Sequence, residues 1–311
     1  METLEINNEI RTLQFEEKRE VESILKDLTI QIGEDRDKIS TNIRVLGELE
    51  FIQAKAKYSI DIVGNEPRLS LKQEMKLYNA YHPILLKRVG RNNVVPLDIE
   101  IDSTANTIVI TGPNAGGKSV AMKTIGLLTV LAQAGCHIPA SSESIVRICT
   151  DIFVDIGDDQ SIEDDLSSFS SHLEKLKIIL KHANHSSLIL IDEIGSGTDP
   201  LEGSSLAAAF LENITSIGSI NVVTTHHGNL KTFAFEHSGM ENGAMEFDAG
   251  TLKPTYHFRK GVPGSSYAIE MAERISLPSD IIHRAMELKG SDAIKLERLI
   301  LDLERKTQEL K

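Results

Sequence analysis

The sequence contains no tryptophan, and only two of its 311 residues are cysteines. A disulfide framework needs several cysteines, so we expect Cys136 and Cys149 to be reduced thiols and exclude a disulfide-built secreted fold. No apolar run approaches the roughly 18 residues that cross a bilayer. The acidic start METLEINNEI also lacks the basic and apolar regions of a signal peptide. We therefore expect a cytoplasmic protein without a membrane partner.

Positive charge is also scarce, because 33 Lys and Arg stand against 46 Asp and Glu, a formal net charge of −13. This balance excludes a protein that coats nucleic acid by bulk charge, although it leaves room for a local basic site. The apolar fraction of 41% is ordinary for a globular protein, so wholesale disorder is excluded. The length suggests about two domains.

The first 60 residues contain no proline, and their apolar residues recur in steps of three and four. This spacing predicts long amphipathic helices, and Gly33 with the polar residues 34–38 marks a turn between two of them. We expect a helical hairpin, with a partner-binding coiled coil as the alternative. The segment 61–70 is predicted to be a linker because it contains Gly64, Asn65 and Pro67.

The pattern changes after about residue 71. Short β-branched runs occur at 94–101, 107–111, 188–191 and 220–224, and helical patterns separate them. This alternation predicts an α/β fold with a largely parallel sheet. After Gly264 the pattern is helical again, and Pro278 is expected in the first turn of a helix.

A phosphate-binding loop is the clearest motif. It follows the apolar run 107–111, precedes a helical pattern that continues from Val120, and matches G-x-x-x-x-G-K-[ST] as Gly112-Pro113-Asn114-Ala115-Gly116-Gly117-Lys118-Ser119. Its backbone N–H groups would surround the phosphates of a nucleotide at a helix N-terminus. Lys118 would reach the β- and γ-phosphates, and the Ser119 hydroxyl would complete the shell of a Mg²⁺ ion. Val120, the next residue, is also expected to contact the nucleotide. The alternative is a glycine-rich turn between a strand and a helix.

Two further strands end in groups that fit nucleotide hydrolysis. The run 187–191 ends in Asp192 and Glu193, where one carboxylate would lie beside the metal and the other could polarise water. The run 220–224 leads to His226 and His227. We expect His226 to sense a γ-phosphate, and we expect His227 to be a solvent-facing or packing residue. The alternative for Asp192 and Glu193 is an ordinary acidic strand end, and the alternative for His226 is a structural histidine.

A serine-rich segment, 164–171, precedes the amphipathic helical pattern 173–180. Taken alone it is a cluster of helix N-cap residues. In ATPases that enclose nucleotide between two protomers, a serine-rich helix start of this kind faces the γ-phosphate of the partner.

In order along the chain, the segments TGPNAGGKS, LSSFSSHL, LILIDEIGSGTDPLEG and TTHHGNL resemble those of the MutS family, and most closely its second bacterial branch. The resemblance covers nearly the whole chain. It implies a P-loop NTPase of the ABC/MutS type at 71–263, with a mostly parallel sheet flanked by helices. A helical lever segment would precede it at 1–70, and a helix-turn-helix dimer brace and the start of a further helix would follow at 264–311.

The resemblance also implies residue roles. The roles given above for Lys118, Ser119, Asp192 and Glu193 are unchanged. His226 corresponds to a switch histidine of the family, and Asn114 is expected to bond the γ-phosphate. Ser167 corresponds to a serine that acts across a head-to-head homodimer, and Asp199 lies on the loop that crosses the interface.

The family stacks adenine on an aromatic residue two positions before a proline. Here that position is Val94, before Pro96, so aliphatic contact is expected instead.

The expected function is that of an ATP- and Mg²⁺-dependent ATPase dimer that drives a clamp on branched or mismatched DNA or on stalled ribosomes. The clamp and the nuclease domain of that branch have no counterpart in the sequence, so the chain is expected to be an excised or truncated piece without nuclease activity. Two alternatives remain: a transporter ATPase of the ABC kind, although LSSFS replaces its LSGGQ motif, and a nucleotide-binding dimerisation module without useful turnover.

Overall fold

The structure is a computed structural model that describes residues 2–113, 116–157, 165–248, 251, 253–264 and 268–289. The chain divides into two compact units, residues 1–58 and 59–311, and each is described by itself. Within the described residues, no helix combines the length and the apolar character needed to span a bilayer.

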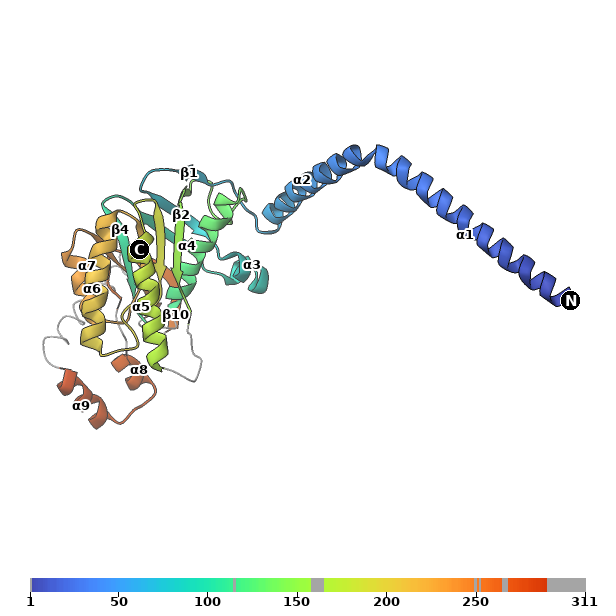
Figure 1. Ribbon diagram of the computed structural model, residues 1–311. Helices are drawn as coiled ribbons and strands as arrows, with labels where there is room; N and C mark the ends of the chain where they lie inside the picture. Colours follow the sequence, from blue (N-terminus) through green and yellow to red (C-terminus); the bar gives the residue numbers. More distant parts are fainter. Residues whose placement is uncertain are drawn as a thin grey trace. The chain divides into compact units, whose positions relative to one another are not determined.

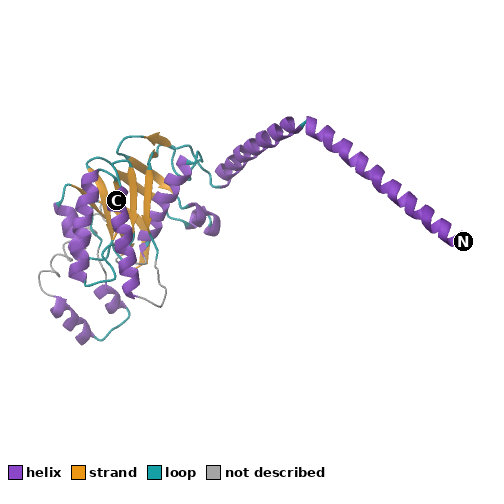
Figure 2. Ribbon diagram, in the orientation of Figure 1, coloured by secondary structure: helices purple, strands orange, loops and turns teal. Residues whose placement is uncertain are grey.

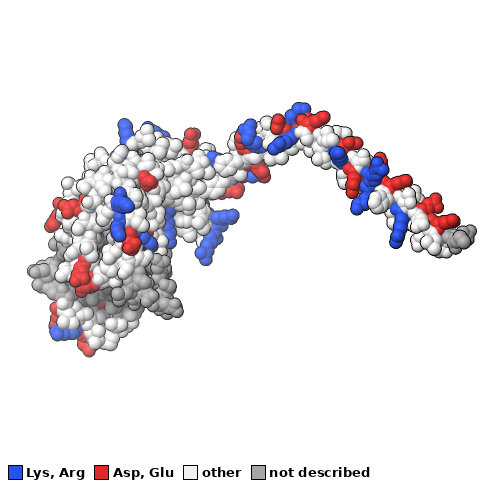
Figure 3. All heavy atoms as spheres, in the orientation of Figure 1, with Lys and Arg blue, Asp and Glu red and all other residues white. Residues whose placement is uncertain are grey.

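The first unit consists of helix α1 (Glu2–Glu34) and most of helix α2 (Arg36–Asp61), as predicted from the apolar spacing. The predicted hairpin is not formed, because only Asp35 separates the two helices, and reversal between antiparallel helices takes about two to five residues. The Asp35 carbonyl still accepts a helical hydrogen bond from the Ile39 N–H at 2.9 Å. Apolar side chains along both helices, from Leu4 to Ile52, remain exposed, and charges of both signs alternate along α1 (Figure 3).

The second unit contains two sheets (Figure 1). The smaller sheet has the order β1-β5-β2-β3, formed by Arg68–Ser70, Ile145–Arg147, Met75–Ala80 and Leu97–Ile101. Helix α3 (Pro83–Val89) and a 3₁₀ turn at Arg91–Asn93 connect β2 to β3. The segment predicted to be a linker belongs to this unit, because Asn65 and Ile138 exchange backbone hydrogen bonds of 2.9 and 3.0 Å.

The larger sheet has the order β10-β9-β4-β8-β7-β6, and all neighbouring pairs are parallel except β10 with β9. In that order its strands are Lys253–Lys260, Gly239–Asp248, Ala105–Thr111, Ile220–Thr224, Ser187–Ile191 and Asp151–Asp155. Ile110 is paired with Thr224, and Ile191 with Val223. The carboxyl ends of β4, β8 and β7 therefore lie at one edge of the sheet, where parallel α/β folds bind ligands.

Helices cover both faces of the larger sheet (Figure 2). One face packs against α4 (Lys118–Gln133) and the smaller sheet, through side chains such as Ile108, Leu190 and Ile125. The opposite face packs against α5 (Asp165–His182), α6 (Pro200–Ile217) and α7 (Gly228–Glu236). The central strands are thus buried on both faces, which explains their continuous apolar runs.

The α/β fold class is confirmed, and the four predicted strand runs coincide with β3, β4, β7 and β8 to within three residues at each end. The helical prediction after Gly264 agrees with α8 (Ala268–Arg274) and α9 (Ser279–Lys289), and Pro278 directly precedes α9. Residues 290–311 lie outside the described part. The division at 70 and 263 into lever, ATPase and brace stays a prediction.

Candidate functional site

The predicted phosphate-binding loop leaves the end of β4 and enters α4. Gly112 has φ +122° and Gly117 has φ +95°, a region that only glycine adopts without strain. Gly117 is the N-cap of α4, so the N-terminal N–H groups of this helix follow the loop directly. Gly116 is also confined, because a Cβ there would lie 3.1 Å from the Met245 Cβ. Asn114 and Ala115 lie outside the described residues, whereas Gly112, Pro113, Gly116 and Gly117 form the described ends of the loop.

Lys118 is buried at the first position of α4, with 2% of its surface exposed. Its Nζ donates a hydrogen bond of 2.6 Å to the Gly112 carbonyl, so the side chain folds back across the loop. Burial lowers the pKa of Lys118; Glu193 and Asp192 act in the opposite direction, and Lys231 adds to the lowering. Lys118 is thus a desolvated ammonium group next to an acidic pair and a second cation. Ser119, the next residue of the helix, is half-buried.

Asp192 and Glu193 follow β7, and one buried threonine of β8 contacts both. The Thr224 hydroxyl donates to Asp192 Oδ1 and accepts from the Glu193 N–H at 2.8 Å. Glu193 has φ +51°, which is unusual for a residue with a side chain, and its carbonyl accepts from Ser196 Oγ at 2.6 Å. The backbone that carries both carboxylates is therefore fixed from two sides. Sequence reasoning gave Thr224 no role.

The two histidines after β8 have different surroundings. His227 is buried, and its Nε2 donates to the Gly195 carbonyl at 3.0 Å, so it is a packing residue. The His226 side chain is exposed. The pKa of His226 is lowered by partial desolvation of its ring and by His227 and Lys118, whereas Glu193 raises it. The three side chains of His226, Lys118 and Glu193 thus act on one another electrostatically, and the net lowering of the pKa favours the neutral imidazole.

Lys231 of α7 lies at the same edge and was missed by sequence reasoning. Its Nζ donates to the Gly264 carbonyl, and the Gly264 N–H donates to Thr111 Oγ1 at 2.8 Å. The segment that follows β10 is thereby tied to the last residue of β4, beside the phosphate-binding loop. No sequence motif marks Lys231.

The serine-rich segment and the loop of Asp199 lie next to each other. Gly197 approaches Phe169 of α5, since a Cβ on this glycine would lie 3.4 Å from the Phe169 Cβ. Asp199 caps α6, and its Oδ1 accepts from the N–H groups of Leu201 and Glu202 at 2.9 and 3.2 Å. Ser167 belongs to α5, but its side chain lies outside the described residues. The residues expected at an interface thus share one region of the α/β unit.

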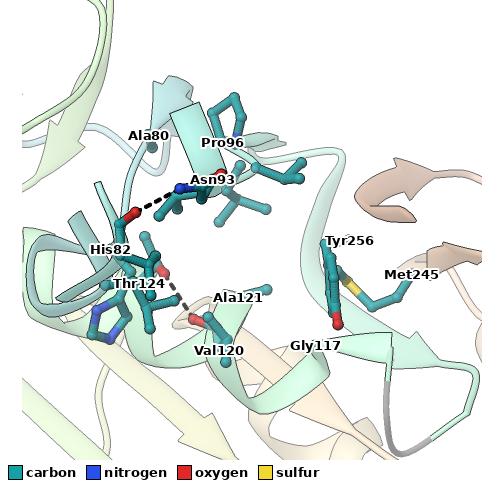
Figure 4. Close-up of a pocket in the computed structure, with 15 residues that line it drawn as sticks. Ala80, His82, Asn93, Pro96, Gly117, Val120, Ala121, Thr124, Met245 and Tyr256 are labelled. Carbon is teal, nitrogen blue, oxygen red and sulfur yellow. Dashed lines mark hydrogen bonds between the residues drawn. The ribbon is translucent and has the colours of Figure 1, made fainter. Parts of the chain in front are cut away.

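A cavity of about 330 Å³ lies beside the start of α4. Val94 and Val120, two predicted nucleotide contacts, line it together with Pro96, Tyr256 and Met245. Figure 4 shows Tyr256 and Met245 on one side of the cavity and Asn93 and Pro96 on another. Aliphatic contact was expected in place of an aromatic ring; the structure adds a ring from β10, more than 150 residues further along the chain.

Comparison with known proteins agrees with this architecture. A family model described as MutS domain V matches residues 108–291, which is more than half of the chain. Three relatives are named Endonuclease MutS2. The first, from Caldanaerobacter subterraneus subsp. tengcongensis, is 44% identical over 98% of this chain and 38% of its own length.

The second, from Thermomicrobium roseum, is 45% identical over 99% of this chain and 40% of its own length. The third, from Pediococcus pentosaceus, is 44% identical over 96% of this chain and 38% of its own length. The chain therefore spans about two fifths of the length of these relatives. Since the domain V model covers most of the α/β unit, the chain belongs to the MutS family.

Proposed function

We propose that the chain is an ATP-binding and ATP-hydrolysing module with a P-loop NTPase core. The observation that carries the proposal is the buried ammonium of Lys118, which folds back to the Gly112 carbonyl at 2.6 Å and lies near Asp192 and Glu193. A desolvated cation is costly unless anions compensate for it. The β- and γ-phosphates of a nucleotide would add to the negative charge that Asp192 and Glu193 already bring near this ammonium.

The residues around the loop fit a triphosphate with Mg²⁺. N–H groups at the start of α4 and the ammonium of Lys118 would hold phosphate oxygens, in line with anion binding at helix N-termini. The Ser119 hydroxyl and the Asp192 carboxylate are oxygen ligands of the kind that Mg²⁺ prefers, and Asp192 is held by Thr224. Bound Mg²⁺ would offset negative charge on the phosphates.

Glu193 is the proposed general base for the attacking water, and the left-handed backbone at this residue gives its carboxylate a defined position. A neutral His226 would hydrogen-bond the γ-phosphate and change its contacts when that group leaves. The cavity lined by Val94, Pro96 and Tyr256 would hold the base, with the Tyr256 ring as the stacking partner.

We further propose that two copies join through their ATPase heads, with Ser167 and Asp199 of one copy at the site of the other. In this proposal residues 1–70 act as the lever, and residues 264–311 form the brace. The target is DNA or the ribosome, reached through a clamp on the longer protein, and the compartment is the cytoplasm. The word endonuclease belongs to relatives more than twice as long, and the proposal for this chain is limited to ATP turnover.

Phosphate release and ATP binding, measured on the same samples with Mg²⁺, test the proposal. The Glu193→Gln variant should keep ATP binding and lose about 10²- to 10⁴-fold in turnover, the usual contribution of a general base. The Lys118→Met variant should lose binding itself. An exposed glutamate of α6 provides the control, since Glu212→Gln should change neither quantity. Full turnover by Glu193→Gln would show that the assigned base is wrong.

Membership of the MutS family speaks against the transporter alternative. A dimerisation module without turnover predicts ATP binding and dimer formation, but no phosphate release at any protein concentration. Solution mass with and without a non-hydrolysable ATP analogue, measured beside phosphate release, separates this alternative from the proposed ATPase.

A further inference from the structure

Strand β10 contains a bulge at the residue that lines the cavity. β10 pairs antiparallel with β9, and Pro254 is opposite Phe247 while Phe258 is opposite Met245. Three residues of β10, 255–257, therefore face a single residue of β9, Glu246. Within this bulge Tyr256 has φ +63°, which an aromatic residue rarely adopts. Such a conformation persists only when neighbouring contacts hold it.

The carboxylate of Glu246 contacts β10 at the first residue of the bulge and again beyond it. At the first residue, the Thr255 hydroxyl lies 3.2 Å from Glu246 Oε2 and 3.1 Å from the Glu246 carbonyl oxygen, and shares its one proton between them. After the bulge, a guanidinium nitrogen of Arg259 donates to Glu246 Oε1 at 2.5 Å. Thr255 Oγ1 also accepts from the N–H of His257 at 3.4 Å, inside the bulge. One carboxylate thus connects the two ends of the irregular segment.

This connection is shielded from water. The side chains of Glu246 and Arg259 are 14% and 13% exposed, so their ion pair is screened much less than a surface pair. The same hairpin contains a second pair, Glu241 with Lys260 at 3.0 Å, whose side chains are about twice as exposed, at 30% and 29%. Of the two pairs, only the buried one spans the bulge.

Packing constrains the Tyr256 side chain only in part, because 51% of its surface is exposed. Its ring nevertheless lies against the start of α4, since a Cβ on Gly117 would be 3.2 Å from Tyr256 Cδ1 (Figure 4). The backbone of the bulge must therefore set the direction of the ring.

We propose that Glu246 is a positioning residue that holds the bulge through Thr255 and Arg259, and so fixes the Tyr256 ring for the base of the bound nucleotide. This inference rests on the proposed ATP site. In this inference Glu246, which lies outside the phosphate-binding loop, contributes to the affinity for the base and not to the binding of the phosphates.

The test compares the Kd of MgATP with that of inorganic tripolyphosphate and Mg²⁺, by calorimetry, in the complete 311-residue chain. Stacking of one base on an aromatic ring is worth about 5- to 150-fold in affinity. We expect Tyr256→Ala to weaken ATP binding by about tenfold or more, and Glu246→Gln by roughly three- to tenfold, with tripolyphosphate affinity unchanged in both. The matched control Glu241→Gln should change neither Kd.

A double variant decides whether Glu246 acts through the ring. Adding Glu246→Gln to Tyr256→Ala should cost no further ATP affinity, because the group being positioned is already absent. Additive losses would overturn the inference, and so would a loss of tripolyphosphate binding by Glu246→Gln or normal ATP binding by that variant. If the unchanged protein binds neither ligand, the proposed function fails; if it binds both and Glu246→Gln behaves normally, only the role of Glu246 fails.

Discussion

Thr224 bonds the Asp192 carboxylate and the backbone N–H of Glu193, and replacing it with valine tests whether the orientation of these two residues limits turnover. Valine has nearly the same shape, so the change removes the hydroxyl and leaves the packing of β8 in place. The side chain has no exposed surface, and its hydroxyl both donates to Asp192 Oδ1 and accepts from the Glu193 N–H. The variant leaves each of these groups without its protein partner.

The expected cost follows from those two bonds. A hydrogen bond to a charged group contributes about 1.5–3 kcal/mol, and a buried N–H without an acceptor costs about 1–3 kcal/mol. Because Asp192 and Glu193 are only half-buried, water compensates in part. We therefore expect the free energy of unfolding to fall by about 2–4 kcal/mol. If half of that loss appears in the transition state for hydrolysis, kcat falls by roughly 5- to 30-fold.

Urea unfolding and steady-state phosphate release measure the two quantities, and ATP binding should stay within about threefold because Lys118 is untouched. The Thr224→Ser variant should restore turnover. The control is Thr107→Val on β4, which removes a buried hydroxyl that lies 2.7 Å from Thr215 Oγ1 and 2.8 Å from Asn221 Nδ2. It should destabilise the fold similarly without lowering kcat. Unchanged kcat in Thr224→Val, with the expected loss of stability, would refute the reasoning.

Three further predictions concern the dimer, acid stability and charge. Mixing Ser167→Ala with Lys118→Met protomers should restore turnover that neither has alone; no restoration would contradict action across the dimer. Burial raises the pKa of Asp155, but hydrogen bonds from His172 and Lys175 outweigh it, and the net pKa is lowered. This stabilisation is present above about pH 4 and lost as pH falls further, so Asp155→Asn should flatten acid unfolding monitored by circular dichroism. At net charge −13, mobility-shift assays near 0.15 M salt should show weak duplex binding, and a submicromolar Kd would contradict this.

The parts of the site that the sequence predicted are those that lie in one continuous segment. Gly112, Gly117 and Lys118 fall within eight residues, and the loop geometry depends on glycine at fixed offsets, so the motif specifies the local structure. Asp192 and His226 could be placed because parallel strands end at the same edge of a sheet. Their predicted strands, β7 and β8, are neighbours, and β8 also pairs with β4.

The remaining parts depend on register and on distant pairing, which no short pattern encodes. Tyr256 lines the cavity from a segment of β10 that has two extra residues opposite β9, and Lys231 is connected to β4 through Gly264. The short strands β1 and β5 were likewise missed, since three residues are too few for a periodic signal. The prediction of a helical hairpin was wrong for a different reason. Periodicity predicts each helix well, but it does not say whether two helices pack together.

Backbone conformation separates structural from functional irregularity in this chain. Among the described residues, five non-glycine residues have positive φ: Val63, Asn79, Glu193, Tyr256 and Ser276. Val63 and Ser276 follow the ends of α2 and α8, where a left-handed residue commonly ends a helix, although this conformation is costly for the β-branched valine; asparagine tolerates it. A helix end or the residue type thus accounts for the positions of these three residues. Neither explanation applies to Glu193 or Tyr256, which lie around the candidate nucleotide site as the proposed base and the proposed stacking ring. Left-handed residues that no local rule explains cluster at functional sites, and the positions of Glu193 and Tyr256 therefore support the proposed nucleotide site.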